Sequence, residues 1–468
     1  MSPREFDVVI VGGGSAGYAA ARTAAAGGLR VAVVEGGAEV GGLCILRGCM
    51  PTKALLQAAD VLHQARRAAT WGLKVSGAGY EYAEVLRRKD RLIQEFADYR
   101  RQQLEDGRFT FIRAGARFID PHTLDLGGQG RVRSRYFIVA TGSSLSKPPI
   151  AGIEGPGAGC LNSDLALHAE RIPESVIVLG GGAVAVEFAQ FYRRFGARVT
   201  LVQRSPRILR EFDADASGVV EGAFRDEGMT VHTGTRLLAA GGMEGGGRFV
   251  EFEQEGGTHR VEAEAIFNGL GRSPNTFGLG LEAAGVDTAH GRIVTDLSMR
   301  TSAPHIFAAG DVAGPYEVVH IAIQQGEVAA HNILHPDAQR AMDYRLKTLV
   351  VFTDPQVAQV GLSEQEAGER GIPVIAASHP FRDHGKSMIM EALDGFVKLL
   401  ADPRTGEILG GACVGPMGGE LIHEIIVAMA RRMTVAELAA VPHYHPTLAE
   451  IWTYPAEELA SRVPLMIG

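Results

Sequence analysis

Two cysteines five positions apart, Cys44 and Cys49, are the residues of this chain best suited to redox chemistry. They lie in the run GGLCILRGCMPTK at residues 41–53. A glycine-rich segment of the kind that binds nucleotides precedes them. Two thiols at this spacing, beside a bound redox cofactor, predict a disulfide that opens and closes during a reaction. Because the chain has only four cysteines, we expect no framework of structural disulfides.

The residues after the second cysteine predict a helix that begins at or just after that cysteine. Pro51 is well suited to a first helical turn, and the composition from Lys53 to about Ala69 favours a helix. We therefore expect Cys49 at or just before the helix N-terminus, where the positive end of the helix dipole and the Lys53 ammonium favour a thiolate. Cys44, further out, would meet the substrate.

The elements that must position these thiols occur twice in the chain. An apolar strand at residues 8–11 leads into a glycine-rich turn, an alanine-rich helix and a second strand at 31–34, and the same order recurs between strands at 176–179 and 199–202. This is the pattern of a βαβ dinucleotide fold, whose glycines let the backbone approach a pyrophosphate at a helix N-terminus. The fingerprint glycines are Gly12, Gly14 and Gly17 in the first copy and Gly180 and Gly182 in the second.

The residue that ends the second strand differs between the two copies. Glu35 ends it in the first copy and can accept hydrogen bonds from a ribose 2′-hydroxyl. Gln203 holds the matching place in the second copy, and Arg204, Arg207 and Arg210 follow it. A carboxylate repels a 2′-phosphate, whereas arginines attract one. We therefore expect FAD at the first site and NADPH at the second, with NADH as the alternative.

Taken together, these segments resemble the class I FAD-dependent pyridine nucleotide–disulfide oxidoreductases, which include dihydrolipoamide dehydrogenase, glutathione reductase and mercuric reductase. The resemblance covers nearly the whole chain and begins with the cysteine run. The other motifs that carry it are ATG at residues 140–142, GLGRSPN at 269–275, IFAAGD at 306–311 and HYHPTLAE at 443–450.

The resemblance implies an α/β fold with two Rossmann-like dinucleotide-binding domains and an α+β C-terminal dimerisation domain. We expect residues 1–145 and 269–345 to form a discontinuous FAD domain and residues 146–268 the NAD(P)H domain. Residues 346–468 would form the interface domain. A homodimer whose active site is shared across the interface is also implied.

The resemblance assigns Cys44 as the interchange thiol and Cys49 as the charge-transfer thiol. Lys53 would pair with Glu187 near the flavin N5 atom, because a buried lysine needs a partner. Further cofactor contacts are expected at Thr141, Gly142, Gly271, Arg272 and Asp311.

His445 and Glu450 are the residues suited to move protons. A histidine titrates near neutral pH and can protonate a leaving thiolate, and a carboxylate on its far nitrogen fixes its tautomer. The two residues are five positions apart around Pro446, so one short turn can bring them together. The resemblance places this pair against the cysteines of the other subunit.

The implied reaction passes electrons from NADPH to FAD, then to the Cys44–Cys49 disulfide and on to a low-molecular-weight disulfide. Two departures from the family pattern leave the substrate open: Leu46 replaces a common asparagine, and Ala183 replaces a bulky residue that usually covers the flavin. One alternative is an NAD-linked dihydrolipoamide dehydrogenase. Another is a flavin-dependent reductase of quinones or other electron acceptors in which the thiols are idle.

The bulk composition excludes several other classes of protein. A net charge of −8 argues against a nucleic-acid partner, and no apolar stretch is long enough to cross a membrane. The low cysteine content favours a cytoplasmic location. No metal site is expected.

Overall fold

The computed structural model describes residues 3–148, 150, 153 and 160–463. The chain divides into two compact units. The first contains residues 1–54, 84–147 and 271–343, and the second contains residues 55–83, 148–270 and 344–468. The three-domain boundaries given above stay a prediction.

The first unit is built on a mixed sheet whose centre is parallel. Its strand order is β3-β2-β1-β6-β5-β4, and β19 pairs with β6. The last four residues of β1, Val8–Val11, are buried, as expected for a central parallel strand covered on both faces. The bounds are β1 Arg4–Val11, β2 Val31–Glu35, β3 Thr110–Arg113, β4 Arg117–Asp120, β5 Thr123–Asp125, β6 Arg131–Val139 and β19 Ile306–Ala308.

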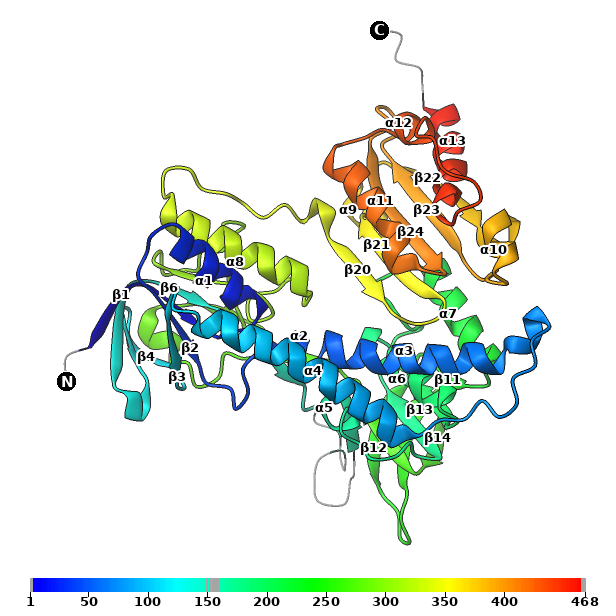
Figure 1. The fold of residues 1–468 in the computed structure, drawn as a ribbon, viewed down its shortest axis with the longest axis horizontal. Coiled ribbons are helices and arrows are strands. Elements are labelled where there is room, and N and C mark those ends of the chain that lie inside the picture. Colours follow the sequence, from blue (N-terminus) through cyan, green and yellow to red (C-terminus); the bar gives the residue numbers. More distant parts are fainter. Residues whose placement is uncertain (1–2, 149, 151–152, 154–159, 464–468) are drawn as a thin grey trace. The chain divides into compact units, whose positions relative to one another are not determined.

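Two helices of the first unit, α1 (Ser15–Ala26) and α8 (Val319–Leu334), lie side by side (Figure 1). Small residues permit this close approach, since a Cβ on Gly326 would overlap the carbonyl oxygen of Ala16. The other elements are α2 Gly42–Leu46, α4 Tyr82–Glu105, β7 Ser143–Leu145, β16 Arg272–Pro274, β17 Thr288–Ala289 and β18 Arg292–Ile293, while α3 (Cys49–Arg66) continues into the second unit.

The second unit contains a five-stranded parallel sheet of order β11-β10-β9-β15-β8. A separate antiparallel sheet, β12-β13-β14, is formed by the segment between β11 and β15. The bounds are β8 Cys160–Asn162, α5 Ser163–Ala166, β9 Ser175–Leu179, α6 Ala183–Arg194, β10 Arg198–Val202, α7 Ala214–Asp226, β11 Thr230–His232, β12 Arg236–Gly242, β13 Arg248–Gln254, β14 Gly257–Ala263 and β15 Ala265–Asn268.

The internal repeat predicted from the sequence is present in the backbone. In the first unit Val8 pairs with Val31 across β1 and β2, and in the second unit Val176 pairs with Val199 across β9 and β10. The first glycine of each turn has nearly the same left-handed backbone, with φ of 107° at Gly12 and 106° at Gly180. The expectation of two Rossmann-like folds is therefore confirmed.

The C-terminal part of the second unit is an antiparallel sheet of order β20-β21-β24-β23-β22, against which α11 and α13 pack. Trp452 is fully buried in its core and donates its indole N–H to the carbonyl of Leu421. The bounds are β20 Thr348–Val351, β21 Gln356–Gly361, α9 Glu364–Arg370, β22 Ile375–Pro380, α10 Gly385–Ile389, β23 Phe396–Ala401, β24 Ile408–Gly415, α11 Gly418–Ala430, α12 Val435–Ala439 and α13 Thr453–Arg462.

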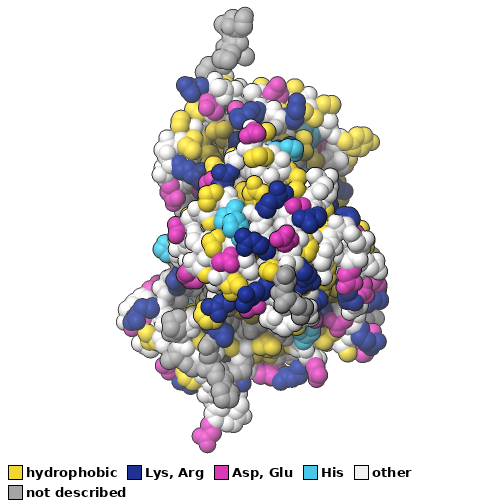
Figure 2. Space-filling view, turned by 90° about the vertical axis from the view of Figure 1, so that its left-hand side faces the viewer, with side chains coloured by type: hydrophobic (Ala, Val, Ile, Leu, Met, Phe, Trp, Pro, Cys, Tyr) yellow, Lys and Arg dark blue, Asp and Glu magenta, His cyan; other side chains and the backbone are white. Residues whose placement is uncertain are grey.

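The surface carries charges of both signs. On the face drawn in Figure 2, basic and acidic side chains are interspersed. Among the described residues, no helix combines the length and the apolar character needed to cross a bilayer.

Candidate active site

The structure brings the two cysteines of the first unit together. Cys44 lies in the short helix α2 and Cys49 is the first residue of α3, as the sequence predicts. Both are free thiols, and a side-chain hydrogen bond joins them. This bond and the burial of Cys44 raise its pKa, while the positive charges of Lys53 and Arg100 act in the opposite direction. The two sulfurs therefore face each other, as a pair that forms a disulfide must.

The cysteine segment lies directly beside the first glycine-rich turn. Gly42, which opens α2, has a left-handed φ of 77°, and a Cβ there would lie 2.7 Å from the Cα of Gly14. Only glycine accepts both the backbone conformation and this approach. A dinucleotide bound at the turn would therefore lie next to the thiols.

The first turn fits the pyrophosphate of FAD. Gly14 caps α1 without any side-chain hydrogen bond, and the first turn of α1 carries no acidic residue. The helix N-terminus is thus open to an anion. A Cβ on Gly12 would overlap the carbonyl oxygen of Ala140, so this position also requires glycine. Gly17 leaves even less room for a side chain, since a Cβ there would overlap the carbonyl oxygen of Gly12.

Glu35 lies where the sequence places it, at the end of β2. Its Oε2 accepts a hydrogen bond of 2.8 Å from the amide of Gly13, and its Oε1 accepts one of 2.6 Å from the amide of Gly37. These two bonds hold the carboxylate beside the glycine turn, where a ribose hydroxyl would be recognised.

A second group of predicted FAD contacts meets at the end of β6. Thr141 Oγ1 donates to the carbonyl of Asn275 at 2.7 Å. Ser143 Oγ donates to Asp311 Oδ2 at 2.6 Å and accepts from Arg272 Nε at 2.8 Å. Ser143, which links the two charged residues, carried no sequence signal beyond its place after the ATG motif. Two glycines with left-handed backbone, Gly142 and Gly271, complete this region.

The second glycine turn also leaves its helix N-terminus open. Gly182 caps α6 without a side-chain hydrogen bond, and a Cβ there would meet no atom within 4 Å. Gln203 is buried against the middle glycine, since a Cβ on Gly181 would lie 2.9 Å from the Gln203 side chain. Gln203 therefore holds, beside the second turn, the position that Glu35 holds beside the first, and an amide replaces the carboxylate.

The three arginines after Gln203 have different environments. Arg204 and Arg210 are exposed. Arg207 instead stabilises the loop between β10 and α7, because its Nη2 donates to the carbonyl of Phe212 and to Gln365 Oε1. Arg204 and Arg210 are thus the arginines with side chains accessible to a 2′-phosphate.

His445 and Glu450, in the second unit, form a hydrogen-bonded pair. His445 Nδ1 lies 2.9 Å from Glu450 Oε2, and the side chains are 77% and 13% exposed respectively. A short 3₁₀ helix at Ala449–Trp452 carries Glu450, and the buried Trp452 anchors it. His443 pairs elsewhere, with its Nε2 2.6 Å from Glu424 Oε1.

Glu187 is a buried residue of α6, with 2% exposure. Its Oε1 accepts a hydrogen bond of 2.9 Å from the amide of Phe352. It is therefore not a solvated surface carboxylate. Lys53 belongs to the first unit and Glu187 to the second, so their pairing stays a prediction.

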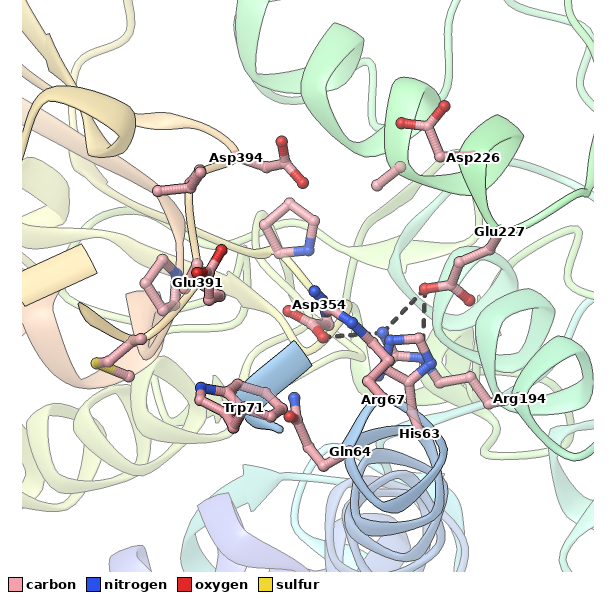
Figure 3. A pocket seen from close by; sticks show the side chains of 16 residues that line it. His63, Gln64, Arg67, Trp71, Arg194, Asp226, Glu227, Asp354, Glu391 and Asp394 are labelled. Atoms are coloured by element: carbon pink, nitrogen blue, oxygen red, sulfur yellow. Dashed lines mark hydrogen bonds and ion pairs between the residues drawn. The ribbon is translucent and has the colours of Figure 1, made fainter. Parts of the chain in front are cut away.

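An arginine that sequence reasoning missed forms the centre of an ionic network. Arg194 is 3% exposed and contacts Asp60, Glu227 and Asp354 at 2.6, 2.9 and 2.8 Å. Burial raises the pKa of Asp60 to about 6. The network borders a cavity of about 290 Å³ that Trp71 also lines (Figure 3). Little in the sequence indicated this role, since Arg194 is one of two adjacent arginines at the end of a mostly apolar helix.

Known proteins resemble this chain over nearly its whole length. Residues 6–326 match the family described as pyridine nucleotide–disulphide oxidoreductase, and residues 348–456 match the dimerisation domain of that family, which supports a homodimer. The chain is 36% identical over 459 residues to a dihydrolipoyl dehydrogenase of Thermus scotoductus, covering 97% of this chain and 98% of the relative. The dihydrolipoyl dehydrogenase of Chlamydia muridarum is 34% identical over 451 residues, covering 96% and 95%.

Solved structures agree with this assignment. LpdA from Mycobacterium tuberculosis superposes with a TM-score of 0.88 at 28% identity, covering 97% of this chain and 99% of that one. A Cu(II) complex of RclA, an HOCl-induced flavoprotein disulfide reductase from Escherichia coli, gives a TM-score of 0.84 at 26% identity, covering 98% and 100%.

Proposed function

Because this chain belongs to the pyridine nucleotide–disulphide oxidoreductases, FAD-dependent enzymes that use NAD(P)H, we propose that it reduces a low-molecular-weight disulfide with NADPH through Cys44 and Cys49. The observation that carries the proposal is the hydrogen bond between these thiols at the N-terminus of α3, beside the first glycine turn. When bound, FAD supplies the two-electron transfer that links a nicotinamide to the sulfur pair.

The thiols perform the exchange in two steps. The Cys44 thiolate attacks one sulfur of the substrate disulfide, which forms a mixed disulfide and releases the other sulfur as a thiolate. Cys49 then attacks the Cys44 sulfur, which frees the second substrate thiolate and forms the Cys44–Cys49 disulfide. The pair has then given two electrons to the substrate. Since the pKa of Cys44 is raised, the first step needs a base.

We assign the proton transfers to His445. Glu450 on Nδ1 leaves Nε2 of the exposed His445 side chain to accept a proton from an attacking thiol and return it to a leaving thiolate. The exposure of His445 suits a residue that acts on the cysteines of a partner subunit, which is the arrangement that the family resemblance implies.

The residues that follow β10 support the preference for NADPH. Gln203 provides no carboxylate to repel a 2′-phosphate, and the adjacent Arg204 is exposed. NADH remains the alternative nicotinamide.

A second candidate function is that of a dihydrolipoyl dehydrogenase. The alignments with the relatives of this name cover more than nine-tenths of this chain and of each relative. The same residues would act in the opposite direction: a substrate dithiol would reduce the Cys44–Cys49 disulfide, and NAD⁺ would receive the electrons. A reductase of quinones with idle thiols would need neither cysteine.

A substrate panel separates these functions. The holoenzyme is assayed with glutathione disulfide, cystine, lipoamide, dihydrolipoamide and a benzoquinone, each with both nicotinamides. We expect Cys44→Ser to abolish disulfide reduction, while the control Cys160→Ser, outside the paired thiols, retains it. Disulfide reduction that survives in Cys44→Ser would refute the proposal. Oxidation of dihydrolipoamide with NAD⁺ as the fastest reaction would select the second candidate, and activity with the quinone alone would select the third.

A further inference from the structure

A buried histidine that the proposed reaction does not use lies behind Glu450. His384 directly precedes α10, and its side chain is 0% exposed. Its Nδ1 lies 2.8 Å from Ser387 Oγ. Its Nε2 lies 3.4 Å from Glu450 Oε1 and has no hydrogen-bond partner among the described residues. A buried polar nitrogen directed at a carboxylate requires an explanation, because leaving it unpaired costs stability.

The surroundings of His384 select one tautomer of its ring. If Ser387 donates its hydroxyl proton to Nδ1, the ring proton lies on Nε2 and points at Glu450. The opposite tautomer would direct the Nε2 lone pair at a carboxylate, which is repulsive. Burial lowers the pKa of His384, and the charge of Glu450 opposes this effect. A neutral ring with its proton on Nε2 is therefore the form that these contacts favour.

We propose that His384 is a positioning residue that holds Glu450 in the orientation in which Glu450 holds His445. The proposal rests on the proposed function, since it assumes that His445 moves protons. Glu450 connects the two rings, with Oε1 facing His384 and Oε2 lying 2.9 Å from His445 Nδ1. The distance of 3.4 Å is longer than a full hydrogen bond, so the contact is an electrostatic one between the Nε2 side of the ring and the carboxylate.

Neighbouring rings fix His384 and provide a matched control. The Tyr454 ring stands edge-on to His384, with centroids 6.3 Å apart, and the His379 ring stacks on Tyr454, with centroids 4.0 Å apart. His379 and His445 are the other titratable groups whose charge acts on His384, together with Glu450. His379 shares the aromatic packing, but no contact joins it to Glu450 among the described residues.

Three variants separate positioning from packing. His384→Leu fills the site without a donor. His384→Gln keeps an N–H close to the position of Nε2, and His379→Gln is the control. Turnover of lipoamide with NADPH is measured across about pH 5.5–9. The imidazole ¹⁵N shifts of His445, assigned from the signal absent in His445→Gln, report the fraction of its ring protonated at Nδ1.

We expect wild-type His445 to show the Nδ1–H tautomer, and His384→Leu to show a mixture of both tautomers. Turnover of His384→Leu should fall about tenfold with little change in the Michaelis constant, because orientation and not substrate binding is lost. His384→Gln and His379→Gln should both behave as wild type. A single Nδ1–H tautomer in His384→Leu would overturn the proposal, whatever the turnover.

Two controls keep the test decisive. If His384→Leu does not retain flavin, Ser387→Ala replaces it, since loss of the Ser387 hydroxyl frees the His384 tautomer and should give the same mixing at smaller amplitude. An unmixed His445 in Ser387→Ala would then refute the proposal. Failure of the proposed function has a separate signature, which is wild-type turnover in His445→Gln, and the tautomer measurement does not depend on it.

Discussion

Nδ1 of His445 lies 2.9 Å from Oε2 of Glu450, yet the histidine is largely exposed and the glutamate largely buried. The carboxylate is anchored in the fold, while the ring it holds extends to the surface. One nitrogen is thereby fixed and the other is free to meet a reacting group. A change in the orientation of Glu450 would thus alter the reactivity of an atom on the outside of the subunit.

We expect Glu450→Gln to lower turnover about 10- to 100-fold with little effect on nicotinamide binding, because the tautomer of His445 is no longer fixed. Steady-state kinetics with lipoamide and NADPH measure both quantities. The control is Glu424→Gln, which removes the carboxylate from a neighbouring histidine, His443, that has no assigned role. Equal losses in the two variants would contradict the assignment.

We expect Cys49→Ala to lower the pKa of Cys44, because the hydrogen bond between the Cys44 thiol and Cys49 is the largest of the effects that raise it. A thiol reacts through its thiolate, so Cys44 should be alkylated by iodoacetamide about tenfold faster at pH 7 in this variant. Peptide mass spectrometry follows the rate at Cys44. Cys160, whose pKa burial raises to about 11, is the internal control and should not change. An unaltered rate at Cys44 would show that the two thiols are not coupled.

We expect Arg204→Glu to raise the Michaelis constant for NADPH about tenfold or more and to affect NADH much less, because a carboxylate repels the 2′-phosphate. The ratio of kcat/KM for the two nicotinamides is the measurement. Arg198→Glu, an exposed charge reversal at the opposite end of β10, should leave the ratio unchanged. Parallel changes for both nicotinamides in Arg204→Glu would remove the preference assigned to this residue.

The Arg194 network should make stability depend on pH through Asp60. Partial burial raises the pKa of this carboxyl to about 6, so the folded state favours its protonated form more than the unfolded chain does. Its contribution to folding is therefore complete below about pH 4 and is lost as the pH rises through 6. The side chain is 46% exposed, so solvent limits the effect to about 1 kcal/mol or less.

Asp60→Asn removes this titration. We expect its melting temperature, relative to wild type, to increase from about pH 4.5 to about pH 7.5. Asp98→Asn, which breaks an exposed helix pair with Arg101, should show no such trend. A constant difference between Asp60→Asn and wild type would mean that Asp60 titrates as it does in the unfolded chain.

The sequence by itself determined the features that are encoded locally. The repeated strand–turn–helix–strand order, the glycine turns and the helix that begins at Cys49 follow from short segments whose backbone conformation depends on their own residues. The adjacency of His445 and Glu450 belongs to the same class, because one short turn joins them. The roles of these residues stay predictions until the variants are measured.

Only the tertiary structure decided which side chains from distant segments meet. Arg194 draws its carboxylates from positions 60, 227 and 354, and His384 meets Glu450 from a separate segment of the chain. Arg207 looked equivalent to Arg204 in the sequence, but the fold uses it to hold a loop. The physical reason is that a buried polar group selects its partner after the apolar faces of separate elements have packed, and no local pattern records which elements will face each other.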